Sequence, residues 1–281
     1  MKTKCTSKIL SLILVMLMLI GITPAVVSAA QTGVTSDGYK YSISNGEVTI
    51  TGYTGESTVV TIPETIDNCP VTKVSSYAFI GNTDITVVVY PKGVTAVEEI
   101  SFANCTSLES IHLPYTVTTI GNSAFFGCTK LVNISIPQNV EVIGNSAFQK
   151  CEGLTNITLP ESVKSIGGLA FAECSKLKTI NIPEGITTIA ESTFENCSSL
   201  KTIKIPATVT SIDQRAFSYC SSLSDVYFGG TIKQWNAVEI GVNNGYLGSA
   251  TIHCQETSEE MFNIYFSNNR NWNNVYIYGY Y

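Results

Sequence analysis

Apolar positions recur with a fixed 23-residue period through residues 91–228, in the phrase P-x-x-V-x-x-I-G-x-x-A-F-x-x-C-x-x-L-x-x-I-x-I. The phase does not drift by a single residue. A fixed period of this length predicts a solenoid, in which each coil buries its apolar face only against its neighbours. The proline, phenylalanine and cysteine positions that mark the six copies are Pro91, Pro114, Pro137, Pro160, Pro183 and Pro206; Phe102, Phe125, Phe148, Phe171, Phe194 and Phe217; and Cys105, Cys128, Cys151, Cys174, Cys197 and Cys220.

The pattern inside one coil predicts its elements. Residues 131–136 alternate as a strand does, and Pro137 ends that strand because proline cannot donate to a ladder. Residues 140–143 give a second short strand, and Gly144 permits a bend into one short helical turn that contains Phe148. We therefore expect an α/β-type repeat solenoid with parallel sheets and short helical turns.

A capping hairpin is expected before the first coil. Residues 39–43 and 47–50 read as two strands joined by the Asn45-Gly46 turn. Such a cap is needed because the first coil would otherwise expose its apolar cross-section and its open backbone edge. After the last repeat, Trp235 is expected to cover the other end.

These features predict five segments. They are a signal peptide (1–30), an N-terminal capping hairpin (31–62), the 23-residue repeats including an irregular first copy (63–228), a C-terminal cap (229–254), and a linker with an incomplete strand-rich segment (255–281).

The first thirty residues have the pattern of a secretory signal peptide. Lys2, Lys4 and Lys8 precede an apolar run at 9–20, and small residues follow at 28–30. The run is too short for a typical membrane span, so we expect no transmembrane segment after cleavage. Export would place the mature protein outside the cell or at the bacterial cell surface.

Composition narrows the classes of partner. The 281 residues are 44% hydrophobic and 14% charged, with 22 acidic against 16 basic side chains and a formal charge of −6. Removal of the three leader lysines would take that charge to −9. An acidic surface argues against nucleic acid as a partner.

The cysteine column invites two interpretations. Neighbouring coils lie roughly 4.8 Å apart, which is within disulfide range, but parallel side chains give poor disulfide geometry and favour buried free thiols. Export to an oxidising environment would still permit these cysteines to form disulfides. Asn82 stands at this position in the irregular copy, which favours a buried polar column bonded to the backbone of the adjacent coil. Zinc needs ligands that converge on one point, and cysteines spaced 23 residues apart along a line do not converge. We therefore expect no metal and no cofactor.

Nothing in the sequence supports catalysis. The two histidines, His112 and His253, lie in separate strands, and every residue of a serine–histidine–aspartate triad would already have a place in the repeat. The best candidates for binding are the outward strand positions, because a solenoid presents such a column as a continuous stripe. They are His112, Ser135, Thr158, Asn181, Lys204 and Tyr227.

The stretch IGNSAFFGCTKLVNISIP at residues 120–137 closely resembles the BspA-like class of leucine-rich repeats of bacterial secreted and cell-surface proteins. The resemblance extends over about residues 41–254, including the GGTIKQWN segment that follows the last repeat. It implies a right-handed, curved leucine-rich-repeat solenoid and a role in extracellular interaction, without fixing the ligand.

The C-terminal segment resembles, more weakly, the opening strands of starch-binding carbohydrate-binding modules. By that resemblance Trp272, Tyr276 and Tyr278 would be candidates for stacking on a sugar. About twenty residues match, and a sandwich module needs several more strands.

These observations predict a non-catalytic scaffold that adheres to another protein or to an extracellular matrix component. The alternative is a repeat spacer that presents a carbohydrate-binding module lying mostly beyond residue 281, with polysaccharide as the partner. A purely structural coat element is a third hypothesis.

Overall fold

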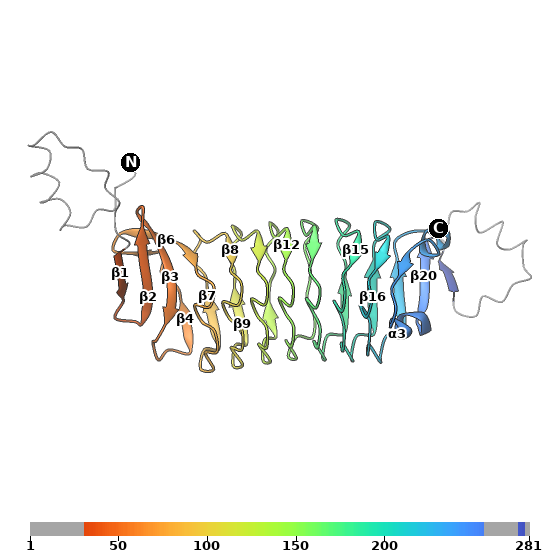
Figure 1. The fold of residues 1–281 in the computed structure, drawn as a ribbon, viewed down its shortest axis with the longest axis horizontal. Helices are drawn as coiled ribbons and strands as arrows, with labels where there is room; N and C mark the ends of the chain where they lie inside the picture. Colours follow the sequence, from red (N-terminus) through yellow and green to blue (C-terminus); the bar gives the residue numbers. More distant parts are fainter. Residues whose placement is uncertain (1–30, 256–274, 279–281) are drawn as a thin grey trace, which may run out of the picture.

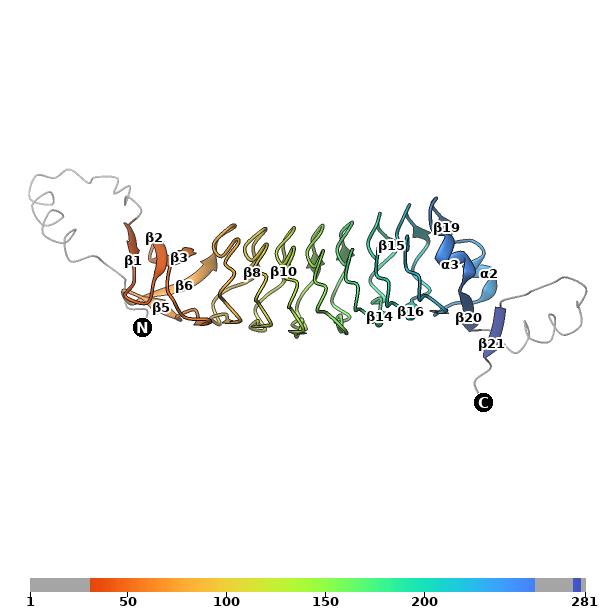
Figure 2. The same cartoon turned by 90° about the horizontal axis from the view of Figure 1, so that it is seen from below.

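A computed structural model describes residues 31–255 and 275–278, which form one elongated stack of coils (Figure 1). Seen from below, successive coils repeat the same outline from the N-terminal strands to the C-terminal ones (Figure 2). The expected signal peptide and Trp272 lie outside the described residues. Within the described ranges, no helix is long and apolar enough to cross a bilayer.

One side of the stack, here called the long-strand face, is made of parallel strands that pair in the orders β4-β7-β9-β11 and β14-β16-β18-β20-β21. Between the two groups, the coil of Asn156 contributes only a single bridge, to Thr179. Register follows the sequence period, as in Thr202 opposite Asp225. The strands are β4 (Val59–Thr61), β7 (Val87–Val89), β9 (Ser110–His112), β11 (Asn133–Ile134), β14 (Thr179–Asn181), β16 (Thr202–Ile205), β18 (Asp225–Phe228), β20 (Thr251–Gln255) and β21 (Val275–Tyr278).

The second side, the short-strand face, consists of two-residue strands in the orders β8-β10-β12-β13 and β15-β17-β19. Each strand before β19 presents one side chain inward and one outward, as Ile143 is buried and Val142 exposed, whereas both residues of β19 are exposed. These strands are β8 (Ala96–Val97), β10 (Thr119–Ile120), β12 (Val142–Ile143), β13 (Ser165–Ile166), β15 (Thr188–Ile189), β17 (Ser211–Ile212) and β19 (Glu239–Ile240).

The third side of each coil is built from tight turns, where the sequence suggested a short helical turn. Gln149 N–H donates to the Ser146 carbonyl at 3.1 Å, and Phe125 N–H donates to Ala147 of the following coil at 2.8 Å. Ser146 and Lys150 take left-handed φ values of 54° and 62°, which interrupt helical propagation. Coil-to-coil hydrogen bonds therefore satisfy the backbone here, as they do on the two strand faces.

Gly144 does not serve an unusual φ, since its φ is not among the positive values. Its role is to let two backbones approach closely. A Cβ at this position would lie 2.6 Å from the Asn122 backbone nitrogen of the preceding coil. The glycine thus permits two coils to meet backbone to backbone.

Ile100 occupies a left-handed position at a φ of 57°, which is unfavourable for a β-branched side chain. Ile100→Asn is expected to raise the free energy of unfolding by about 1 kcal/mol relative to Ile100→Ala, because asparagine tolerates this conformation. Both variants lose the same apolar contact, so the difference between their urea midpoints reports the backbone term. Equal midpoints would contradict it.

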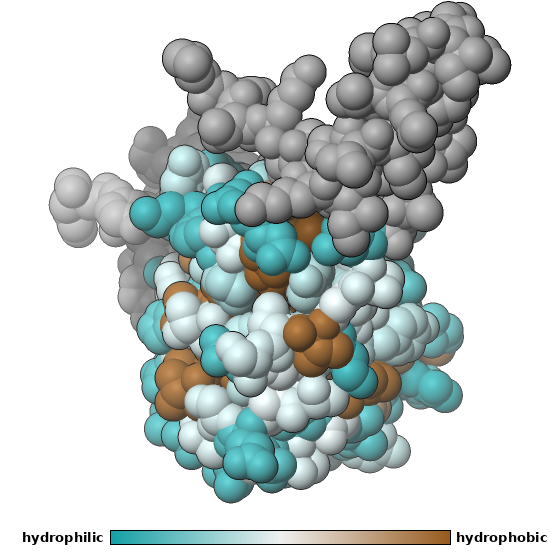
Figure 3. Space-filling view, turned by 90° about the vertical axis from the view of Figure 1, so that its left-hand side faces the viewer, coloured by the Kyte–Doolittle hydropathy of each residue, from teal (hydrophilic) through white to brown (hydrophobic). Residues whose placement is uncertain are grey.

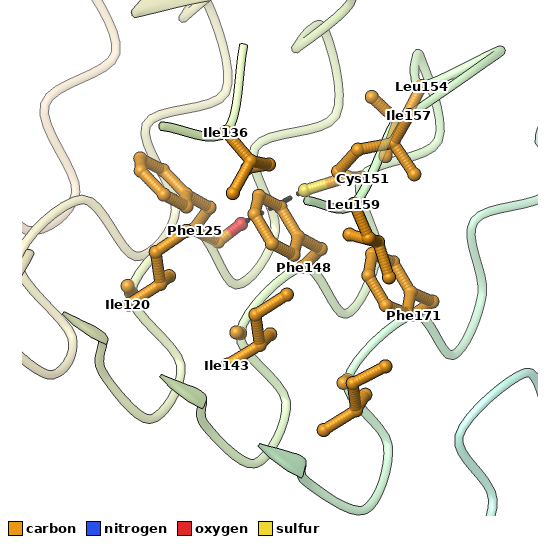
Figure 4. Close-up of a cluster of buried hydrophobic side chains, with 14 of the residues drawn as sticks. Ile120, Phe125, Ile136, Ile143, Phe148, Cys151, Leu154, Ile157, Leu159 and Phe171 are labelled. Atoms are coloured by element: carbon orange, nitrogen blue, oxygen red, sulfur yellow. Dashed lines mark hydrogen bonds between the residues drawn. The ribbon is translucent and has the colours of Figure 1, made fainter. Parts of the chain in front are cut away.

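A continuous ladder of aromatic rings fills the centre of the stack (Figure 4). Phe148 lies between Phe125 and Phe171, with ring centroids 5.3 and 5.4 Å away and interplanar angles of 16° and 4°. The ladder continues to Phe217, and at the other end it passes through Phe79 to the cap. Each coil therefore contributes one wedge to a shared core, as the period predicted.

The six column cysteines are buried free thiols, which confirms the interpretation as free thiols over that as disulfides. Cys151 Sγ lies 3.3 Å from the Phe125 carbonyl oxygen of the preceding coil, and the same contact recurs along the column at 3.0 to 3.3 Å (Figure 4). The thiols thus form the polar column that the sequence suggested, each donating to the neighbouring coil.

Asn82 differs from the prediction for that column. Its side-chain oxygen accepts from the N–H groups of Asp84 and Ile85, at 3.0 and 3.1 Å, within its own turn. Asn82 therefore stabilises a local turn.

The N-terminal end carries the expected hairpin, formed by β2 (Tyr39–Ser44) and β3 (Glu47–Tyr53). Asn45 and Gly46 both have positive φ values, 51° and 80°, as a two-residue hairpin turn of this kind requires. An additional strand, β1 (Gln31–Val34), pairs with β2, while β3 pairs in parallel with β6 (Cys69–Val74), which also pairs with β5 (Thr65–Ile66). Viewed from this end, the atoms not drawn in grey are mostly hydrophilic or neutral, with separate hydrophobic spots (Figure 3).

The opposite end is closed by two short helices, α2 (Ile232–Trp235) and α3 (Gly245–Ser249). Thr231 and Gln234 form a capping box at the start of α2. Trp235 is buried, and its ring meets Phe228 edge-on at 5.3 Å. It therefore covers the last regular coil, as expected.

Candidate binding site on the long-strand face

All six predicted column residues are exposed on the long-strand face. Asn181, Lys204 and Tyr227 stand opposite one another in successive strands. His112 pairs with Val89 in the earlier sheet. Ser135 and Thr158 lie outside the paired strands, so the backbone ladder is interrupted between the two groups. Asn181, Lys204 and Tyr227 thus lie on adjacent paired strands, and the break in the sheet separates them from His112.

His253 continues the column and was missed in the sequence because its coil is longer. It stands opposite Tyr227, although 26 residues separate the two instead of 23. The two short helices occupy that coil and break the period. Only the apolar alternation of residues 250–254 signalled a further strand.

Tyr227 and His253 form a stacked pair at the C-terminal end of the column. Their ring centroids lie 4.4 Å apart at an interplanar angle of 10°. His253 Nε2 is 2.8 Å from Asp225 Oδ1, and the Ser224 hydroxyl donates to the other carboxylate oxygen at 2.6 Å. These two hydrogen bonds, with that from Ser224 the larger cause, lower the pKa of Asp225 below its ordinary value. The Asp225 carboxylate therefore holds the His253 ring in its stacked position against Tyr227.

A groove of about 680 Å³ runs beside these residues. One wall is formed by the outward side chains of the column, and Glu161 and Glu184 stand on the other side. In the two coils that follow Glu184, the corresponding positions carry no charge, because they are Ala207 and Gly230. Further lining comes from Ile182, Ile205, Pro206, Phe228, Gly229, Cys254 and Gln255. The volume falls within the range of small-ligand sites.

A second, more acidic hollow of about 500 Å³ lies at the edge of the short-strand face, lined by Glu191, Asp213 and Glu239 among others. Within residues 31–255 and 275–278, no three histidine, cysteine or acidic side chains are placed to hold a metal ion.

Of the residues compared with starch-binding modules, Tyr276 and Tyr278 lie on β21, which pairs in parallel with β20. Tyr276 stands opposite His253, so this segment is the next rung of the long-strand face. Trp272 lies outside the described residues. Stacking of these residues on a sugar stays a prediction.

Comparison with known proteins fits this architecture. The family described as "BspA type Leucine rich repeat region" matches residues 72–167, 141–258 and 201–279, in six copies. A leucine-rich repeat protein of T. pallidum is 33% identical, with a TM-score of 0.61 over 72% of this chain and 90% of that one. A second, from Bacteroides ovatus, is 26% identical, with a TM-score of 0.65 over 92% of this chain and 67% of that one. No curated protein matches the chain significantly. The chain therefore belongs to the BspA-type leucine-rich repeat family.

Proposed function

We propose that the protein is a secreted or surface-displayed scaffold, without catalytic activity, that binds another protein or a matrix component through the long-strand face. The observation that carries this proposal is the exposed column from Asn181 through Lys204 to Tyr227, next to which the buried His253 stands in register. Parallel pairing fixes the spacing of these side chains, so a partner would meet a rigid stripe. The apparent signal peptide supports an extracellular location.

The proposal predicts that bulky charges on the long-strand face abolish adhesion. Beads coated with residues 31–281 would be tested on immobilised basement-membrane extract. Thr158→Arg combined with Asn181→Arg should reduce bead retention at least about tenfold, because each exposed arginine obstructs a flat contact and changes its charge.

The matched control is Ser165→Arg with Thr188→Arg, two exposed outward positions on the short-strand face. It adds the same charge and should leave retention unchanged. Equal loss in both pairs, or no loss in the first, would contradict adhesion through the long-strand face.

The alternative of a starch-binding accessory module stays a prediction for the segment after residue 255. Pairing of β21 with β20 gives residues 275–278 a place in the solenoid sheet, which argues for a different use of that segment. Retention of residues 31–281 on insoluble starch, with none for residues 31–254, would favour the alternative.

A further inference from the structure

We propose that the groove beside Tyr227 is a peptide-recognition site that takes an extended segment of a partner protein, with a basic side chain against Glu161 and Glu184 and an aromatic side chain against Tyr227. This inference rests on the proposed function and assigns the chemistry of the partner. Its grounds are the shape of the groove, the charges on its wall and the fixed position of one aromatic ring.

The groove is elongated along the solenoid because it spans several coils. Glu161, Glu184 and Pro206 lie in three successive coils on one side, and Gly229 follows in the next. On the other side, Asn181, Lys204, Tyr227 and His253 advance by one strand each. An extended chain laid across the strands would therefore meet the acidic pair first and the aromatic pair last.

The acidic end is ordered and lacks a basic partner. The Glu161 carboxylate accepts a hydrogen bond from the Glu184 backbone N–H at 3.2 Å, which holds the two acids side by side. Neither side chain forms an ion pair with any residue in the described ranges. Two adjacent exposed carboxylates favour a cationic group of the ligand.

Lys204 opposes this charge but does not outweigh it. The groove lining carries two carboxylates, on Glu161 and Glu184, against the single ammonium of Lys204. The Asp225 carboxylate is already engaged by His253 at 2.8 Å. Glu161 and Glu184 thus determine the charge that a ligand meets, while Lys204 is placed to donate to a peptide carbonyl.

Tyr227 supplies the apolar end. His253 covers one face of its ring at 4.4 Å, and the hydrogen bond between His253 Nε2 and Asp225 Oδ1 fixes His253 in turn. The tyrosine nevertheless remains 40% exposed. A large side chain held in place before binding loses little entropy on binding, which is why tyrosines so often anchor interfaces.

The test uses residues 31–281 and two blocked peptides, acetyl-Gly-Arg-Gly-Tyr-Gly-amide and the same peptide with glutamate replacing arginine. Isothermal titration calorimetry at low salt should detect the arginine peptide and give at least about fivefold weaker binding for the glutamate peptide. Glu161→Gln with Glu184→Gln should weaken the arginine peptide about fivefold, whereas Lys204→Gln should not weaken it more than twofold. Tyr227→Ala should weaken both peptides.

The control is Glu141→Gln with Glu191→Gln, which removes two carboxylates from the short-strand side and should leave peptide affinity unchanged. Each variant should unfold at the same temperature as the wild-type protein, which would exclude misfolding as the cause of weaker binding. The inference is overturned if both peptides bind alike, if neither binds, if the control weakens binding as much, or if maltoheptaose binds the groove and neither peptide does. Failure of these peptide tests, with matrix adhesion still lost in the Thr158→Arg and Asn181→Arg double variant, would leave the proposed function standing.

Discussion

Replacing Phe148 by alanine is expected to lower the free energy of unfolding by about 3 to 5 kcal/mol, the range measured for large aromatic residues removed from packed cores. Phe148 is fully buried and stacks on a phenylalanine in each neighbouring coil. Because each coil is stabilised only by its neighbours, the cavity weakens two interfaces at once. Urea unfolding followed by circular dichroism would measure the change.

Phe126 provides the matched control. It lies directly after Phe125, is only half-buried, and has the Lys150 ammonium 5.7 Å from its ring centroid. Phe126→Ala is expected to cost less than about 1.5 kcal/mol, since this ring is partly exposed and lies outside the stacked ladder. Similar losses for both variants would show that the ring ladder is not the centre of the core.

The repeat period predicted the parts of the fold that depend on inward side chains. Phe148, Leu154 and Ile157 recur at constant spacing because each must meet its copy in the next coil, and that requirement leaves a direct trace in the sequence. The outward column was predicted by the same reasoning, since strand alternation places its members opposite the buried set. All six proved exposed.

The third side of the coil could not be predicted in the same way. Ser146, Lys150 and Leu169 all adopt left-handed backbone conformations, yet none is glycine or asparagine, the residues that usually signal such a turn. Coil-to-coil hydrogen bonds impose the conformation there, and long-range constraints of this kind leave no local pattern. The sequence therefore suggested a short helical turn.

The groove escaped sequence reasoning for a related reason. It combines glutamates at two successive repeat positions, Glu161 and Glu184, which the next two coils lack, with His253, which is displaced from the period by α2 and α3. A repeat pattern describes what successive coils share. A site formed where they differ becomes visible only when the coils are placed side by side.

Raising the pH from 9 towards 11 is expected to unfold the solenoid through its cysteine column. Burial raises the pKa of Cys105, Cys174 and Cys220 to about 12, and it raises the pKa values of Cys128, Cys151 and Cys197 well above the ordinary value. In the unfolded chain the thiols ionise near pH 8.5 to 9. Above that pH the unfolded chain has lost protons that the folded chain still binds, so stability falls as the pH rises.

The expected slope is steep. Each thiol contributes about 1.4 kcal/mol per pH unit between its two pKa values, and six together contribute on the order of 8 kcal/mol per unit. Stability from this source is complete below about pH 8.5 and is lost progressively towards pH 12. Urea midpoints measured at half-unit steps from pH 7 to 10.5 would record the decline.

Cys151→Ala combined with Cys174→Ala separates this effect from other alkaline titrations, including that of Tyr39, whose pKa burial raises to about 12. The double variant loses two thiols that donate to the carbonyls of Phe125 and Phe148, so it should be less stable at pH 7. Its dependence on pH should nevertheless be about one third shallower, because two of six titrating groups are gone. An unchanged slope, or thiols that react with Ellman's reagent in the folded protein at pH 8 as fast as in 6 M guanidinium, would refute the role of the buried column, because a thiol that stays protonated cannot act as the nucleophile.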